Sequence, residues 1–265
     1  MAQYLGVDIG GTNLRAAVAA GGLEILGRAT TATPQDATAA DITDEVIDTV
    51  ERACVEADCR PHSLVAAGIG SVGPLDREAG TIAGPANITG MERPISLVEP
   101  LAELLGTDRI VLRNDTVCGV VAESELAGDP AENLAYLTVS TGIGAGVIVD
   151  GHILSGSDGN VGEIGHLTLD PAGQMRCGCG RDGHWEAYAG GAHIPRYAEY
   201  LSQKESVDTD LPVGTDALDA ADVFDAAGAD PLADRVLERI ARWNTLGVAN
   251  LIQAFAPSEI AVGGA

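Results

Sequence analysis

The sequence contains almost no lysine. Lys204 is the single lysine among 15 basic residues, which face 39 acidic residues and leave a formal net charge of −24. A surface of this charge repels phosphate backbones and anionic lipids, so nucleic acids and membranes are poor partners for it. The acids are spread along the chain, which excludes an acidic tail. A cationic partner is one explanation, but the even spread favours adaptation to a cytoplasm of high salt, where ions screen self-repulsion. We therefore expect a protein from a halophile.

Aromatic residues are also scarce, at 3% of the chain against 46% for all hydrophobic residues. Small apolar side chains, mainly Ala and Val, must therefore fill the interior. The length of 265 residues is enough for one large domain or two ordinary ones. No apolar run is long enough to span a bilayer, and the first strand begins at Tyr4 with no room for a signal peptide before it. We expect a cytoplasmic protein.

The five cysteines are odd in number, so a closed set of disulfides is not expected in a cytoplasmic chain. Cys54 and Cys118 lie in segments of helical pattern, and we expect both to be small core residues. Cys59 has no evident role. Cys177 and Cys179 differ from these because they share a glycine-rich segment with two histidines.

The first 20 residues predict two strands joined by a glycine turn. The turn contains residue types that can form a phosphate-binding site, namely Asp8, Gly10, Gly11, Thr12 and Asn13. Glycine permits positive φ and lets backbone N–H groups approach an anion, and Thr12 and Asn13 add side-chain donors. Asp8 is placed to hold a hydrated Mg²⁺ beside that anion. An ordinary tight hairpin is the alternative, and the adjoining Asp and Thr favour the phosphate site.

A second hairpin repeats this design. A strand at residues 133–139 is followed by the turn Ser140-Thr141-Gly142 and by a further apolar strand. The repetition predicts two related lobes that face one another across a cleft. Periodicity and breaker residues predict further strands at 23–30, 64–69 and 258–262, and helices at 40–57, 117–126, 192–210 in part, 217–227 and 231–250.

Between the two hairpins, the apolar run at residues 110–112 leads into Asn114 and Asp115 and then into a predicted helix. Strand ends that lead into helix N-termini are the places where open α/β sheets bind ligands. We interpret Asp115 as a general base. Asn87 lies in a Gly- and Pro-rich stretch and either presents its amide to a ligand or only forms a turn, and composition favours the turn.

The segment from 156 to 191 is rich in glycine, His, Cys and acids. Four side chains in it form a closed two-Cys, two-His set of the kind that binds structural zinc: His166, Cys177, Cys179 and His184. A metal would order a loop that packing cannot order. The alternative is two free thiols and two surface histidines. Glu163 and Glu186 bracket the set and would be held as hydrogen-bond acceptors.

Together these residues resemble the ROK family of sugar kinases and repressors, in the actin-like ATPase superfamily. The resemblance covers essentially the whole chain. It implies an α/β fold of two lobes (ribonuclease H-like), each a mixed sheet flanked by helices, with residues 1–112 in a small lobe and 113–265 in a larger one. The motifs that carry it are the Asp8 to Thr12 turn, the Thr141 to Gly146 turn, Asn114-Asp115, Glu163-x-Gly-His166 and Cys177-x-Cys-Gly-x-x-Gly-His184-x-Glu186.

The resemblance implies ATP-dependent phosphorylation of a hexose, with glucose as the expected substrate and Mg²⁺ and structural Zn²⁺ as cofactors. Asp115 would take the proton of the sugar 6-hydroxyl as that oxygen attacks the γ-phosphate. Sugar hydroxyls would be bound by Asn87, Asn114, Asp115, Glu163, His166 and Glu186. Nucleotide would be bound by the first turn (Asp8 to Asn13), by Thr141 and Gly142, and by Gly263 and Gly264. A homodimer or larger homo-oligomer is expected.

Three features differ from the family pattern. His184 stands where the family usually has a third cysteine, and Val117 stands where it has a further Asn. Family members continue past Gly263-Gly264 into further helices, so we expect this chain to be truncated at its C-terminus. Kinases for N-acetylmannosamine, N-acetylglucosamine or fructose, and a non-catalytic sugar-binding regulator, are the alternatives. A repressor is disfavoured, because no DNA-binding domain fits before residue 8.

Overall fold

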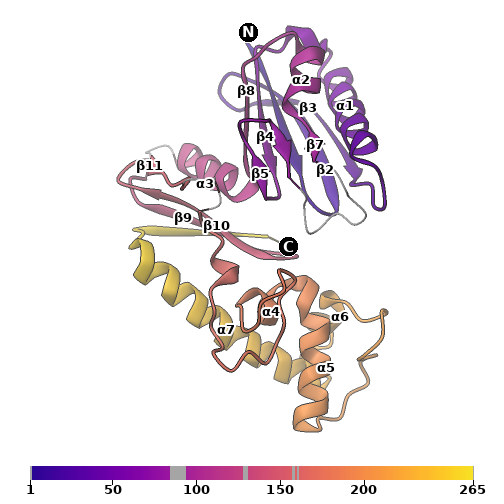
Figure 1. Cartoon of the computed structure of the whole chain (residues 1–265), viewed down its shortest axis with the longest axis vertical. Helices are drawn as coiled ribbons and strands as arrows, with labels where there is room; N and C mark the ends of the chain where they lie inside the picture. The colour runs from indigo at the N-terminus through magenta and orange to yellow at the C-terminus, as the bar shows by residue number, and fades with distance from the viewer. Residues whose placement is uncertain (1, 84–93, 128–130, 157–158, 160, 265) are drawn as a thin grey trace. The chain divides into compact units, whose positions relative to one another are not determined.

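The computed structural model describes residues 2–83, 94–127, 131–156, 159 and 161–264 (Figure 1). The chain divides into two compact units. Unit 1 comprises Met1–Cys118 and Ser155–Asn160, and unit 2 comprises Gly119–Leu154 and Val161–Ala265. Each unit has its own sheet and its own buried apolar cluster.

The sheet of unit 1 has five strands in the order β3-β2-β1-β4-β8. Strands β1, β2 and β3 form an antiparallel meander, whereas β4 and β8 run parallel to β1. Ile9, Ser71 and Asn114 are level with one another, so the carboxyl ends of the three parallel strands meet at one edge of the sheet. The strands are β1 Gln3–Ile9, β2 Asn13–Ala20, β3 Ile25–Ala32, β4 Ala66–Ser71 and β8 Ile110–Asn114.

Helices α1 (Ala39–Glu56) and α2 (Val98–Leu105) supply apolar side chains to the core of unit 1. A capping box between Thr38 and Asp41 begins α1, and its buried face repeats at helical spacing through Ile42, Val46, Val50 and Ala53, as predicted. The prediction missed a small sheet of β5 (Leu75–Asp76), β6 (Thr81–Ile82) and β7 (Ile95–Ser96) and the 3₁₀ turn Pro61–Ser63.

The sheet of unit 2 has the order β11-β10-β9-β12, which repeats the order of the first four strands of unit 1. In both units an antiparallel hairpin carries the glycine turn, and a parallel strand pairs with the first strand of that hairpin. The predicted internal repeat is therefore present in the strand topology. The strands are β9 Leu134–Val139, β10 Ile143–Val149, β11 His152–Ile153 and β12 Glu259–Gly263.

Three of the nine aromatic residues of the chain are buried, and all three belong to unit 2. Trp185 is fully buried and packs on Gly247 of α7, where a Cβ atom would lie 2.3 Å from the indole. Tyr188 and Tyr197 belong to the same core. The helices are α3 Asp115–Leu126, whose first turn belongs to unit 1, α4 Glu186–Ala189, α5 Ile194–Glu205, α6 Ala220–Asp225 and α7 Pro231–Phe255, with 3₁₀ turns at Ile164–His166 and Gly191–His193. Among the described residues, no helix has the length and apolar character required to cross a membrane.

Asp230 is a buried carboxylate at the start of α7. It accepts hydrogen bonds from the backbone N–H groups of Leu232, Ala233 and Asp210 and from the hydroxyl of Thr209, at 2.8 to 3.0 Å. Burial alone would raise its pKa, but these bonds favour the ionised form and lower the pKa from its ordinary value of 3.8. Asp230 therefore joins the acidic loop before α6 to the N-terminus of the longest helix.

We predict that Asp230→Ala lowers the free energy of unfolding by about 2 to 3 kcal/mol at pH 7, because it removes a helix cap and leaves donors unpaired. The measurement is urea unfolding, with the exposed Asp216→Ala as the matched control. A lowered native-state pKa contributes stability above the unfolded value and loses it as the pH falls through the native value. The difference in the free energy of unfolding between the unmodified protein and Asp230→Ala should therefore become smaller from pH 7 to pH 3. A difference that stays constant would contradict this account.

Candidate active site

In unit 1, the candidate site lies at the edge where the parallel strands end. Asp8 is the penultimate residue of β1, and Asn114 is the last residue of β8. Arg15 on β2 lies directly opposite Asp8, and its Nη1 is 2.8 Å from Asp8 Oδ2. Sequence reasoning missed Arg15, although hairpin register alone places it there. The carboxylate of Asp8 is half exposed and keeps room for a hydrated cation.

The glycine turn between β1 and β2 is held through its carbonyl groups. Thr33 Oγ1 donates to the Gly10 oxygen at 2.8 Å, and Gln35 Nε2 donates to the Gly11 oxygen at 2.9 Å. Within the described residues the N–H groups of Gly11 and Thr12 have no hydrogen-bond partner, so the tip offers donors to an anion.

The prediction that these glycines supply positive φ is wrong, because neither Gly10 nor Gly11 has a positive φ. Gly10 is required by close approach, since a Cβ atom there would lie 3.2 Å from the Asn13 oxygen, which accepts the hydrogen bond of the Gly10 N–H at 2.9 Å.

Asn114 and Asp115 are oriented by the first turn of α3. The Oδ1 atom of Asn114 accepts hydrogen bonds from the N–H and the hydroxyl of Thr116, at 3.0 and 2.6 Å. Asp115 Oδ1 accepts from the same N–H at 2.8 Å. The amide nitrogen of Asn114 is therefore the end of that side chain available to a ligand, and Asp115 lies at a helix N-terminus, where the macrodipole stabilises a carboxylate.

The thiol of Cys118 lies within the electrostatic reach of both Asp115 and Asp8. Burial first, and then the negative charges of Asp115 and Asp8, raise the pKa of this thiol to about 11, while Arg113 opposes them. We expected Cys54 and Cys118 in the core. Cys54 is in the core, but Cys118 is only half-buried, with its Sγ 3.2 Å from the place of a Cβ atom on Gly70.

In unit 2, the second glycine turn is held by the segment around α4. Glu186 Oε2 accepts from the Ile143 N–H at 2.9 Å, and a Cβ atom on Gly142 would lie 2.5 Å from that oxygen. The Gly191 and Ala192 N–H groups donate to the Ser140 and Thr141 oxygens. A Cβ atom on Gly264, whose φ is 122°, would lie 2.0 Å from the Val139 oxygen. The C-terminal glycines thus lie beside the end of β9, next to the Thr141 turn.

The four predicted metal ligands come together. The ligand atoms of His166, Cys177, Cys179 and His184 all lie within 4.8 Å of one another. Cys177 Sγ is 3.6 Å from His166 Nδ1, and Cys179 Sγ is 3.3 Å from His184 Nδ1. Zn–S bonds of about 2.3 Å and Zn–N bonds of about 2.0 to 2.1 Å at tetrahedral angles require an S···N separation of about 3.6 Å.

Without a bound cation, the surroundings of this cluster favour neutral side chains. Burial, together with the Cys179 thiol and Glu186, raises the pKa of Cys177 to about 12, although a backbone hydrogen bond from Cys179 opposes this. Burial lowers the pKa of His184, which favours the neutral imidazole that a metal requires. The Gly178 N–H donates to Nε2 of the buried His193 at 3.1 Å. Sequence reasoning missed His193, which supports the turn between the two cysteines.

Glu163 and Glu186 lie against this cluster. Glu163 Oε2 is 3.7 Å from His166 Nε2, so the two ring nitrogens of His166 face different partners. Burial raises the pKa of Glu163 and the charge of Glu186 adds to this, while His166 opposes it. Asn87 lies outside the described residues. The structure thus gathers Asp8, the first glycine turn, Asn114 and Asp115 in unit 1, and the remaining described site residues in unit 2.

Comparison with known proteins finds whole-chain similarity. Residues 4–265 match the ROK family. The chain is 34% identical to the glucokinase of Aeropyrum pernix, over 100% of this chain and 82% of that protein. It is 35% identical to the ROK hexokinase structure from Thermus thermophilus, with a TM-score of 0.78, covering 99% of this chain and 81% of that one. The Streptomyces griseus ROK glucokinase structure, in complex with glucose and AMPPNP, is 31% identical, with a TM-score of 0.74 and coverages of 99% and 83%.

We predict that Asp115→Asn and Asp8→Asn each increase the alkylation rate of Cys118 at pH 9 by about two- to five-fold, because each removes a negative charge that raises the thiol pKa. The measurement is iodoacetamide labelling followed by mass spectrometry of the Cys118 peptide. The exposed Asp108→Asn, which makes the same charge change, should leave the rate unaltered. Unchanged labelling in both test variants would show that the two carboxylates do not share the site.

Proposed function

The chain belongs to the ROK family, and on that basis we propose that it transfers the γ-phosphoryl group of ATP to the 6-hydroxyl of a hexose, preferentially glucose. The similarity to glucokinases over the whole chain supports this reaction. The observation that carries it is the placement of Asp115 at the start of α3, on the same sheet edge as the donor-presenting glycine turn.

The carboxylate of Asp115 would accept the proton of the sugar 6-hydroxyl as the hydroxyl oxygen forms its bond to the γ-phosphorus. The bond between that phosphorus and the bridging oxygen breaks, and ADP leaves with its electron pair. Phosphoryl transfer depends on positioning and charge stabilisation more than on covalent catalysis, so one base and rigid binding groups suffice. Asn114, whose oxygen is engaged by Thr116, would donate its amide N–H to the sugar.

The nucleotide would be bound by two hairpins of the same design. The amides of Gly11 and Thr12 and the side chains of Thr12 and Asn13 would bind phosphate oxygens, and Asp8 would hold Mg²⁺ through water. Mg²⁺ supplies neutralisation of phosphate charge. In unit 2, Thr141, Gly142, Gly263 and Gly264 lie at one end of β9 and would bind the rest of ATP.

The sugar hydroxyls would be bound by Glu163, His166 and Glu186, with Asn87 as a further donor. His166, Cys177, Cys179 and His184 would hold Zn²⁺, which supplies rigidity rather than reactivity because all four coordination positions are protein atoms. With Nδ1 on the metal, His166 is fixed in the tautomer that leaves Nε2–H as a donor toward Glu163 and the sugar. Glu186 also holds the second glycine turn, because its Oε2 accepts a hydrogen bond from the Ile143 N–H.

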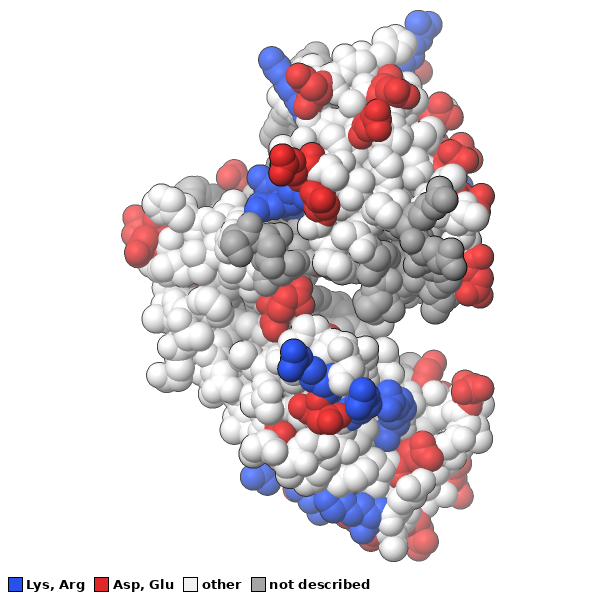
Figure 2. Space-filling model, viewed as in Figure 1, with Lys and Arg blue, Asp and Glu red and all other residues white. Residues whose placement is uncertain are grey.

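Acidic side chains are spread over the face of the molecule drawn in Figure 2. A surface of this charge fits a cytoplasm of high salt concentration, where ions screen its self-repulsion. We include in the proposal a halophilic source, a cytoplasmic location and a homodimeric or larger assembly. The assay should therefore be run in both dilute and molar KCl.

We predict that Asp115→Asn lowers kcat by about 10²- to 10⁴-fold while glucose binding, measured by calorimetry, changes little. Asp108→Asn is the matched control and should retain full turnover. The assay couples ADP release to NADH oxidation, with Mg-ATP and glucose, mannose, fructose, N-acetylmannosamine and N-acetylglucosamine in parallel. Normal turnover in Asp115→Asn would refute its role as base, and faster turnover of an N-acetylated sugar would replace glucose as the substrate.

We predict about one Zn²⁺ per chain by elemental analysis and a lower melting temperature after chelation, because the metal would cross-link a glycine-rich loop. Hydrogen exchange should then accelerate between residues 161 and 190. Cys179→Ser should lose the metal, whereas Cys59→Ser, with a thiol outside the cluster, should keep it. A melting temperature indifferent to chelator would count against the metal site.

A further inference from the structure

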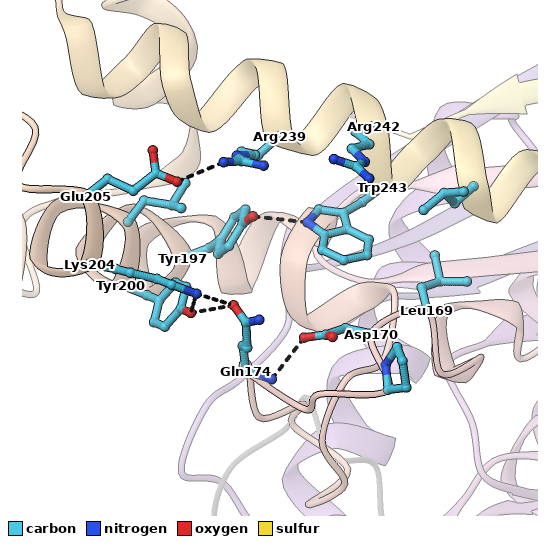
Figure 3. A pocket seen from close by; sticks show the side chains of 13 residues that line it. Leu169, Asp170, Gln174, Tyr197, Tyr200, Lys204, Glu205, Arg239, Arg242 and Trp243 are labelled. Carbon is cyan, nitrogen blue, oxygen red and sulfur yellow. Dashed lines mark hydrogen bonds and ion pairs between the residues drawn. The ribbon is translucent and has the colours of Figure 1, made fainter.

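Unit 2 contains a pocket that none of the predicted sugar, nucleotide or zinc residues lines. Its volume is about 390 Å³, within the range of small-molecule sites. It lies between α5, α7 and the loop that begins at Leu169, and Figure 3 shows side chains from all three converging on it. The residues used below are Gln174, Tyr197, Tyr200, Lys204, Arg239, Arg242 and Trp243.

Three basic and two acidic side chains line the pocket, in a chain where acids outnumber bases 39 to 15. Lys204, the single lysine, donates to Gln174 Oε1 at 2.7 Å and to the Tyr200 hydroxyl, and forms no ion pair within the described residues. Arg242 has neither a hydrogen bond nor an ion pair among the described residues. Arg239 binds Glu205 through Nη2 at 2.9 Å, while its Nε is buried without a partner.

The two acids that line the pocket are already engaged. Glu205 accepts from Arg235 at 2.6 Å as well as from Arg239. Asp170 accepts from the Tyr188 hydroxyl and from the N–H groups of Ala172 and Gln174. Burial alone would raise the pKa of Asp170, but these bonds lower it, and the positive charge of Lys204 adds to them. Among the described residues, the lining of the pocket thus carries one more basic than acidic side chain, with Arg242 in no ion pair.

Aromatic rings give the pocket a rigid apolar wall. Trp243 Nε1 donates to the Tyr197 hydroxyl at 3.0 Å, and the indole lies on Tyr188 with centroids 4.4 Å apart. Tyr197 and Tyr200 are stacked at 13°. Flat rings beside guanidinium groups favour a ligand that has both a ring and an anionic group.

We propose that this pocket binds a small organic anion: a flat ring against Trp243 and Tyr197, with its phosphate or carboxylate group attracted by the charges of Arg242 and Lys204. A bidentate contact from Arg242 would give the anion its orientation. The pocket is preformed, because its aromatic wall is fixed by hydrogen bonds and ring contacts. The proposal is independent of sugar phosphorylation, and its failure would leave the proposed kinase activity untouched.

The test is titration of the protein with phenyl phosphate in dilute buffer, followed by tryptophan fluorescence. Trp243 lines the pocket and the only other tryptophan, Trp185, is fully buried, so the signal reports this site. Saturable quenching is expected, with affinity falling in molar KCl. Arg242→Gln and Lys204→Gln should each weaken binding about tenfold. Arg60→Gln is the matched control, because it removes the same charge from an exposed position in unit 1 and should bind normally.

Three results would overturn the proposal. Unaltered affinity in both Arg242→Gln and Lys204→Gln would place the ligand elsewhere. Equal binding of uncharged phenol would show that the basic groups recognise no anion. Absence of phenyl phosphate binding, together with dissociation of an oligomer by Arg242→Gln in sedimentation, would assign the pocket to contact with a second copy of the chain.

Discussion

The candidate chemistry of this protein depends on the register of three parallel strands. Ile9, Ser71 and Asn114 are level in the sheet of unit 1, so the ends of β1 and β8 lie on either side of the end of β4. A shift of one residue in the pairing of β1 would turn the Asp8 side chain to the opposite face of the sheet. Burial raises the pKa of Cys118 most, and the charges of Asp115 and Asp8, near the ends of these strands, raise it further.

In unit 2, the segment that carries the Cys and His cluster is rich in glycine, and its side chains Ile164, Met175 and Trp185 are buried in the core. Glu186 connects the second glycine turn to the Cys and His cluster, because one carboxylate oxygen accepts from Ile143 while the other lies 3.6 Å from Cys177 Sγ. Glu186 thereby links the turn, the cysteines and the proposed sugar acceptors. A substitution at Glu186 would disturb all three together.

The charge imbalance makes the few basic groups informative. Most acids of the chain lie on the surface and need no specific partner, whereas arginines that find an acid, such as Arg15 and Arg235, form short ion pairs. Arg242 and Lys204 form no ion pair within the described residues, and both line one pocket. Their position beside Asp170 reflects the folding of α5 against α7 and is not encoded in any contiguous motif.

The sequence by itself determined the α/β class, the long helices, the paired glycine turns and the grouping of His166, Cys177, Cys179 and His184, because periodicity and local spacing carry that information. It misassigned Cys118, misjudged the reason for Gly10, and did not indicate Arg15, His193 or the basic pocket. Only the tertiary structure decided these, since each depends on residues far apart in the chain: Cys118 meets Asp8 across the sheet, His193 meets Gly178, and Trp243 meets Tyr197. Local pattern predicts which residues form an element, whereas long-range packing determines which side chains come into contact.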